Sequence, residues 1–200
     1  MPLAIRCRCG TLQAELEPRH AYARAACYCG DCQAFARFLG REAEVLDAHG
    51  GTDIVATLPA SLRFTAGAEH LACMSLSPKG LLRWYAACCR SPIANTPRDP
   101  RVAYVGVVGD SLAATAREKD AAFGPLRIAL NAKSAQGEVA ATPLATFACV
   151  LRIMRGLLGA RLRGHHRDNP FFDAASGLPV RTPHVLDKAA RAAVDPTRPS

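Results

Sequence analysis

Seven of the nine cysteines lie in three short clusters, and this spacing constrains the fold more than any other feature of the chain. The clusters are Cys7-Arg8-Cys9-Gly10, Cys27-Tyr28-Cys29-Gly30-Asp31-Cys32 and Cys88-Cys89-Arg90-Ser91. Thiolates grouped in twos and threes are typical ligands of zinc. An odd cysteine count, with some pairs only one residue apart, fits a disulfide framework poorly. We therefore expect the chain to bind Zn2+.

Seven thiolates cannot complete two four-cysteine sites, but they can form one closed site and one three-cysteine site with a free fourth position. The sequence-distant pairs Cys7/Cys9 and Cys88/Cys89 are the natural partners for the closed site, which would couple metal binding to folding. Cys27, Cys29 and Cys32 would then hold the open site. A four-thiolate zinc site carries net negative charge, so Arg6, Arg8 and Arg90 stand where they could compensate it.

Cys88 and Cys89 are adjacent, which is unusual for two ligands of one ion. Successive side chains in a strand face opposite ways, so the backbone must kink if Cys88 is a ligand. In the alternative, only Cys89 binds, and Cys73, a water or a histidine completes the shell. Cys89 is the stronger candidate of the two, and Cys149 is expected to be a packing residue.

Composition and charge limit the compartment and the partners. The 200 residues are 50% hydrophobic, and a net charge of +8 favours anionic partners. The N-terminus lacks the apolar core of a signal peptide, and no run approaches the ~18 apolar residues expected of a membrane span. We therefore expect a cytoplasmic protein, where thiols stay reduced. The chain also lacks a dense basic run interleaved with aromatics, which argues against nucleic acid.

Residues before about position 115 read as short β segments separated by turns. Residues 11–16 alternate polar and apolar, and residues 71–76 and 81–86 flank the turn signal Ser77-Pro78-Lys79-Gly80, which predicts a hairpin. Residues 102–108 are rich in β-branched side chains and predict a buried strand. Residues 33–39 predict one or two helical turns.

After about residue 130 the pattern becomes helical. Thr142-Pro143 has the form of an N-cap followed by proline at the first helical position, and Gly164 offers a stop. We expect this helix to be a lid that packs its apolar side on the β segments and leaves its arginines in solvent. The alternative is a surface helix for anionic lipid or nucleic acid. The side expected to be buried is formed by Phe147, Val150, Leu151, Met154, Leu157 and Leu158.

The cysteine elements resemble those of the glutathione-dependent formaldehyde-activating enzyme (GFA) family, which includes the centromere protein V-like domains. That family's pattern is C-x-C-G, then C-x-C-x-x-C, then an aromatic followed by C-x-x-C-G-[ST]. The first two elements match, with Tyr28 where histidine is usual. The third departs, because aligning Cys89-Arg90-Ser91 places Ala86 where the earlier cysteine belongs. Trp84-Tyr85 keeps the aromatic lead-in, and together with Pro170-Phe171-Phe172-Asp173 resembles a poorly characterised bacterial branch.

The resemblance implies a mainly β fold of the β-tent kind, with short antiparallel strands in a zinc-binding domain over residues 1–125. Residues 126–200 would form a C-terminal helical and loop extension packed on it. It also implies a carbon–sulfur lyase, with Cys27, Cys29 and Cys32 as catalytic ligands and a small thiol such as glutathione and an aldehyde as substrates. The competing interpretation is a non-catalytic zinc-binding interaction domain with a basic surface. The sequence does not distinguish oligomeric states.

Overall fold

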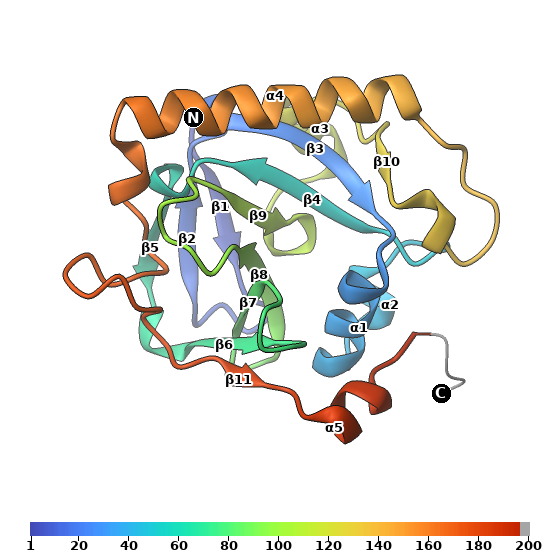
Figure 1. The fold of residues 1–200 in the computed structure, drawn as a ribbon, viewed down its shortest axis with the longest axis horizontal. Helices are drawn as coiled ribbons and strands as arrows, with labels where there is room; N and C mark the ends of the chain where they lie inside the picture. The colour runs from blue at the N-terminus through green and yellow to red at the C-terminus, as the bar shows by residue number, and fades with distance from the viewer. Residues whose placement is uncertain (197–200) are drawn as a thin grey trace.

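The computed structural model describes residues 1–196 and is mainly β, with two sheets and a long helix along one side (Figure 1). This confirms the mainly β fold class with a helical C-terminal extension. Residues 197–200 of the expected extension lie outside the described residues. The strands are β1 (Leu3–Arg6), β2 (Gln13–Leu16), β3 (Ala21–Cys27), β4 (Thr52–Thr57), β5 (Leu62–Ala66), β6 (Leu71–Ser75), β7 (Leu82–Ala86), β8 (Ser91–Thr96), β9 (Val105–Val108), β10 (Ala129–Leu130) and β11 (His184–Val185). The α-helices are α1 (Gly30–Leu39), α2 (Glu42–Val45), α3 (Ala116–Phe123), α4 (Pro143–Leu162) and α5 (Lys188–Ala193).

The strands form a small sheet in the order β1-β2-β5 and a large sheet in the order β10-β3-β4-β9-β8-β7-β6-β11. Neighbouring strands are antiparallel except at the two outer edges of the large sheet. There β10 pairs with β3 and β11 pairs with β6, both in parallel. The part of the chain after residue 125 therefore covers both edges of a sheet that the earlier residues build, and covered edges are protected from pairing with other chains.

Several predicted elements are present. The hairpin is confirmed, because β6 and β7 pair antiparallel with Leu71 opposite Ala86. The strand expected at 102–108 begins only at Val105, and the helical turns expected at 33–39 are part of a longer helix that starts at Gly30. Gly40 ends α1 in the left-handed conformation, with φ of 64°, which glycine adopts at little cost.

The main core lies between the two sheets and is centred on Trp84. Its ring is fully buried, and its Nε1 donates to Thr96 Oγ1 at 2.9 Å. Phe171, from the Pro170-Phe171-Phe172-Asp173 segment, is also fully buried with its ring centroid 4.9 Å from that of Trp84. Residues of the C-terminal third thus complete a core whose strands come from the first 108 residues of the chain.

Helix α4 packs on β3 and faces outward with the side that was expected to be buried (Figure 1). Phe147 is 70% exposed and Met154 is 58% exposed, whereas Cys149 and Ala160 are buried against the sheet. A Cβ added at Gly156 would lie 2.5 Å from the ring of Tyr22, so the helix approaches β3 through small residues. The expectation that Phe147 and its neighbours pack on the β segments is therefore wrong, because the small residues permit the closer approach.

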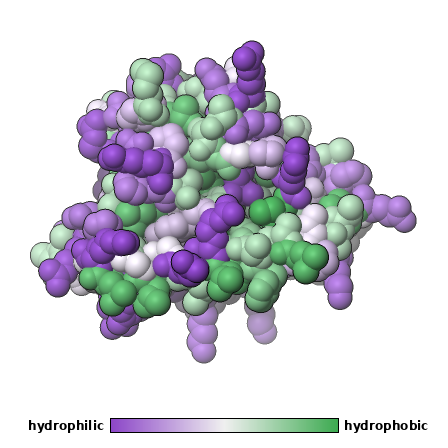
Figure 2. All heavy atoms as spheres, turned by 90° about the horizontal axis from the view of Figure 1, so that it is seen from above, coloured by the Kyte–Doolittle hydropathy of each residue, from purple (hydrophilic) through white to green (hydrophobic). Residues whose placement is uncertain are grey.

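The sequence was expected to contain no membrane-span candidate, but α4 is long and apolar enough to be one. It has 20 residues, its most apolar window has a mean hydropathy of 1.4, and 11% of that window is buried. Length and composition alone thus meet the requirement for crossing a bilayer. Figure 2, which looks down on the side that carries α4, shows hydrophobic side chains gathered in a band between hydrophilic ones.

Candidate metal centres

The first candidate centre joins two segments that are about eighty residues apart in the sequence. The Sγ atoms of Cys7, Cys9, Cys88 and Cys89 all lie within 4.8 Å of one another. Cys7 and Cys9 are 3.5 Å apart, and Cys88 lies 3.8 Å from Cys7 and 3.3 Å from Cys9. A tetrahedral zinc site with Zn–S bonds of about 2.3 Å has S–S edges of about 3.8 Å. The four thiols therefore fit one zinc ion.

Adjacent cysteines reach this group because the chain turns sharply after β7. Residues 87–90 form a turn in which the Arg90 N–H donates to the Ala86 carbonyl at 2.8 Å. Arg90 has a φ of 57°, a left-handed conformation that is uncommon for a residue with a side chain. The kink that two adjacent ligands require is thus present, and Cys88 and Cys89 both point into the cluster.

Neighbouring groups polarise the sulfur atoms of this first cluster. The Leu12 N–H donates to Cys7 Sγ at 3.2 Å, and the Ser91 hydroxyl lies 3.1 Å from Cys89 Sγ. Hydrogen bonding with Thr11 is the main cause that lowers the pKa of Cys9 to about 6, whereas burial raises the pKa of Cys7. Hydrogen bonds that orient ligands in this way are typical around protein metal sites.

The second candidate centre is formed by Cys27, Cys29 and Cys32, whose Sγ atoms lie within 4.8 Å of one another. Cys27 ends β3, Cys29 is the N-cap of α1 and Cys32 lies in the first helical turn. Cys32 is buried, and the other two are partly exposed. Hydrogen bonds from Cys29 and then Cys32 lower the pKa of Cys27, so the cluster concentrates negative charge on this sulfur. The donor set suits a soft metal and offers three protein ligands.

A buried cation and an amide adjoin the second cluster. Hydrogen bonds with Cys27 and Cys29 raise the pKa of Cys32. Arg83 on β7 is 2% exposed, and its positive charge acts in the opposite direction. Asn131, just after β10, lies with its Nδ2 3.6 Å from Cys27 Sγ. Its φ of 57° turns the chain back toward the cluster. The part of the chain after residue 125 therefore contributes directly to the surroundings of this centre.

A tyrosine also lies near the second cluster. The Tyr104 phenol has its pKa raised to about 12, chiefly by burial and then by the negative charges of Cys27 and Cys32. It therefore keeps its proton at neutral pH. Arg83, Asn131 and Tyr104 were not expected from the sequence, because nothing in their local sequence distinguishes them from other residues of their types.

Tyr28 and Asp31, inside the cysteine loop, have structural contacts. The Tyr28 hydroxyl donates to Asp47 Oδ2 at 3.0 Å, and the tyrosine is buried. Asp31 accepts from Arg191 of α5 at 2.9 Å and lies 3.8 Å from Arg83. These contacts anchor the loop to its neighbours.

Of the three arginines expected to compensate the first cluster, Arg90 directs its guanidinium to another element. Arg90 donates to the backbone carbonyls of Phe38 and Leu39, at the end of α1. Arg6 and Arg8 line a cavity that also contains Glu44. Compensation of the thiolates by Arg6 and Arg8 stays a prediction, whereas Arg90 links the first cluster to the helix that begins at the second.

The remaining two cysteines stand apart from both groups. Cys73 is buried on β6, where burial raises its pKa to about 12, and Cys149 is buried under α4. Neither is among the cysteines that converge. The alternative in which Cys73 replaces Cys88 is therefore unnecessary, because four sulfur atoms already meet without it.

These features define a mainly β protein with two cysteine groups that could hold metal ions. The model of DUF6151, described as a family of unknown function, matches residues 1–182, and the chain belongs to this family. Comparison with curated proteins gives no match. Among solved structures, a crystal structure of a Rhodobacter sphaeroides protein is similar, with 19% identity and a TM-score of 0.42. The likeness covers 62% of this chain and 100% of that one.

Proposed function

We propose that the protein binds zinc at both cysteine groups. The ion at the first group would be structural, and the ion at the second group would have one coordination position that the protein does not fill. The division into four and three thiols carries this proposal. Four thiolates complete a tetrahedral shell, whereas three leave one position for a water or a substrate. Cys27 and Cys29 are partly exposed, which is consistent with access for a small molecule.

The reaction we propose is the reversible addition of a thiol to an aldehyde, as the resemblance to the GFA family implies. The thiol sulfur bonds to the carbonyl carbon, the C=O double bond becomes a single bond, and the thiol proton ends on the new hydroxyl. The reverse breaks the same carbon–sulfur bond and returns both reactants. Zinc, when bound, would supply an open position and a positive charge that favours the ionised form of a thiol.

The chain's own residues have distinct roles in this proposal. Arg83 is buried beside Cys32 and offsets part of the negative charge of the thiolates. Asn131 orients Cys27 through its side-chain amide. Glutathione suits the site as a thiol because its two carboxylates complement the net charge of +8.

Metal stoichiometry and a spectroscopic probe test the proposal. Native mass spectrometry of the folded protein should give two zinc ions per chain. With cobalt in place of zinc, added glutathione should shift the visible absorption, because a thiol enters the coordination shell of the second site. Cys29→Ser should abolish this shift and leave the protein folded, whereas Cys9→Ser should lower the Tm.

Cys149→Ala provides the matched control, because this buried cysteine lies outside both groups. It should retain two zinc ions and the glutathione response. Equal unfolding by Cys29→Ser and Cys9→Ser would mean that both sites are architectural and would refute the lyase. Two bound ions in a folded protein that never responds to thiols would instead support the non-catalytic zinc-binding domain.

A further inference from the structure

Helix α4 is built with its small side chains inward and its large apolar side chains outward. The inward side includes Cys149, Gly156 and Ala160, which lie against the β3 region. The outward residues are large, and at least half of each side chain is exposed. They are Leu144 (85%), Phe147 (70%), Leu151 (50%), Met154 (58%), Leu158 (60%) and Leu162 (79%). We call these six residues the outer stripe.

The spacing of the outer stripe places its members on one line along the helix. Steps of three and four residues keep side chains on the same face, because an α-helix has 3.6 residues per turn. Contiguous apolar patches of this kind on a folded chain mark a surface that meets a protein or a membrane. Figure 2 shows the band of hydrophobic side chains on this side of the molecule.

The charged residues of helix α4 and of the segments next to it in the sequence are of one sign. The sequence has no Asp or Glu between Glu138 and Asp168. The same stretch contains five arginines, namely Arg152, Arg155, Arg161, Arg163 and Arg167. By the helical repeat, Arg155 and Arg161 flank the outer stripe on opposite sides. A helix with an apolar stripe and basic flanks is the pattern of helices that lie in a lipid–water interface.

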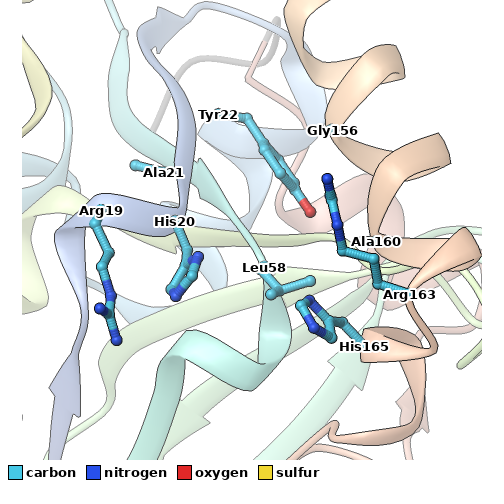
Figure 3. A pocket seen from close by; sticks show the side chains of 9 residues that line it. All are labelled: Arg19, His20, Ala21, Tyr22, Leu58, Gly156, Ala160, Arg163 and His165. Atoms are coloured by element: carbon cyan, nitrogen blue, oxygen red, sulfur yellow. The ribbon is translucent and has the colours of Figure 1, made fainter.

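A basic cavity of 370 Å³ lies at the C-terminal end of α4 (Figure 3). Arg19 and His20, from the 3-10 helix η1 (Pro18–His20), line one side of it. Arg163, the C-cap of α4, and His165, from the 3-10 helix η6 (His165–Arg167), line the other side. Its lining, within the described residues, contains no carboxylate. The cavity therefore extends the positive surface beyond the outer stripe.

We propose that α4 docks this protein, through the outer stripe and its flanking arginines, onto the surface of an anionic lipid bilayer. Charge complementarity selects this occupant. A second copy would bring the same arginines close to one another without an acid in α4 to pair with them. Nucleic acid would match the arginines but would leave six large apolar residues against a polar surface. Gly156 packed on Tyr22 holds the helix to the β3 region, which favours lying on the bilayer over crossing it.

Vesicle flotation of the full-length protein tests this docking. The protein should float with vesicles of phosphatidylcholine containing about one third phosphatidylglycerol and remain at the bottom with phosphatidylcholine alone. Raising the salt from about 0.05 M to about 0.5 M should release most of it, because exposed charges are screened. The double variant Leu151→Ser/Leu158→Ser should bind at least ~tenfold more weakly, since each buried leucine contributes substantially to partitioning.

Matched variants separate docking from general effects of surface changes. Leu178→Ser alters a residue that is 64% exposed in a distant loop and should leave flotation unchanged. Arg152→Gln/Arg155→Gln should weaken binding to anionic vesicles by about tenfold. Arg117→Gln, on α3, should have little effect. Circular dichroism and zinc content should be unchanged in all of these variants.

Three outcomes would overturn the proposal. The first is absence of flotation with anionic vesicles by a folded, zinc-loaded protein. The second is equal binding to neutral vesicles, or binding that Leu178→Ser weakens as much as the stripe variant. The third is a concentration-dependent dimer that Leu151→Ser/Leu158→Ser dissociates without any lipid binding, which would assign the outer stripe to a second copy. None of these results depends on the chemistry of the zinc sites.

Discussion

Two adjacent cysteines, Cys88 and Cys89, join one thiol cluster because a single backbone feature turns both side chains the same way. The turn at residues 87–90 replaces the alternation of a strand, and the left-handed Arg90 completes it. Arg90 is then held by carbonyl groups at the end of α1. A strained backbone position thus serves the geometry of the cluster, and its side chain fixes the direction in which the chain leaves it.

The protonation of the first cluster predicts how zinc affinity depends on pH. The pKa of Cys9 is lowered to about 6, while burial raises that of Cys7 and raises that of Cys88 to about 12. Near pH 7 the metal-free cluster therefore holds protons that zinc must displace. We expect the affinity to fall by more than about tenfold per pH unit as the pH is lowered from about 8 to about 6.

Competition with a chromogenic chelator across this pH range measures the affinity. Isothermal titration in buffers of different ionisation enthalpy counts the protons released on binding. Cys73→Ser is the control, because Cys73 is buried outside both groups and should leave the pH dependence unchanged. An affinity that stays constant across the range would show that the thiols are already ionised or do not bind the metal.

At the scale of one element, α4 shows how small residues set the orientation of a helix. The side that contacts β3 is defined by Gly156 and Ala160, and the larger apolar residues face solvent. Periodicity alone identifies the helix and its two sides but does not say which side is buried. Burying the side with the large apolar residues would remove more apolar area from water. The observed orientation therefore requires either that close packing at Gly156 stabilises the helix by more than this burial would, or that the outer side binds a partner.

Two glycines of α4 form a matched pair for testing this packing. An added Cβ at Gly156 would lie 2.5 Å from the Tyr22 ring, whereas at Gly159 it would meet only the flexible end of Arg163 at 3.1 Å. We expect Gly156→Ala to lower the free energy of unfolding by about 1–3 kcal/mol through overpacking. Gly159→Ala should raise it by up to about 1 kcal/mol, because alanine favours the helix.

Denaturant-induced unfolding followed by circular dichroism measures both changes under one set of conditions. Equal stabilisation by the two substitutions would contradict the packing of α4 on β3, since both sites would then behave as open helix surface. Tyr22→Ala in the Gly156→Ala background offers a further check. It removes the ring and should relieve the overpacking.

For the whole molecule, the part of the chain after residue 125 shares the core and the large sheet with the residues before it. Phe171 lies against Trp84, β10 and β11 extend the large sheet, and Arg191 pairs with Asp31 in the cysteine loop. Asn131 brings the same part of the chain to the second cluster. The expected boundary near residue 125 separates regions of different sequence character, and the contacts across it are extensive.

Phe171→Ala tests whether this packing stabilises the entire fold. A fully buried phenylalanine replaced by alanine leaves a cavity, so the free energy of unfolding should fall by about 3–5 kcal/mol. Phe147→Ala is the matched control, because that side chain is 70% exposed and its loss should change stability by less than about 0.5 kcal/mol. Guanidinium unfolding monitored by Trp84 fluorescence gives both values.

Similar small effects of the two substitutions would mean that residues 169–173 are not part of the main core.

A biphasic transition in the unmodified protein, with Trp84 fluorescence lost separately from helix content, would mean that α4 and its neighbours unfold as an independent unit. We expect a single transition in the zinc-loaded protein.

The amino-acid sequence by itself determined which residues could meet a metal and where several of the elements lie. Cysteine spacing is a local property, and the alternation of residues 11–16, the turn at 77–80 and the start of the long helix at Pro143 are local as well. Each of these signals is contained in a short segment, so it needs no knowledge of distant contacts.

Only the tertiary structure decided that Cys88 joins Cys7, Cys9 and Cys89, which side of α4 is buried and which residues surround the second cluster. Cys7 meets Cys88, and Asn131 meets Cys27, across long separations in the sequence. Such contacts depend on the order of the strands and on how closely their backbones approach. Sequences with the same local patterns could bring different residues together if their strands were ordered differently. The physical reason is that packing is a property of the assembled chain, whereas periodicity and ligand spacing belong to its segments.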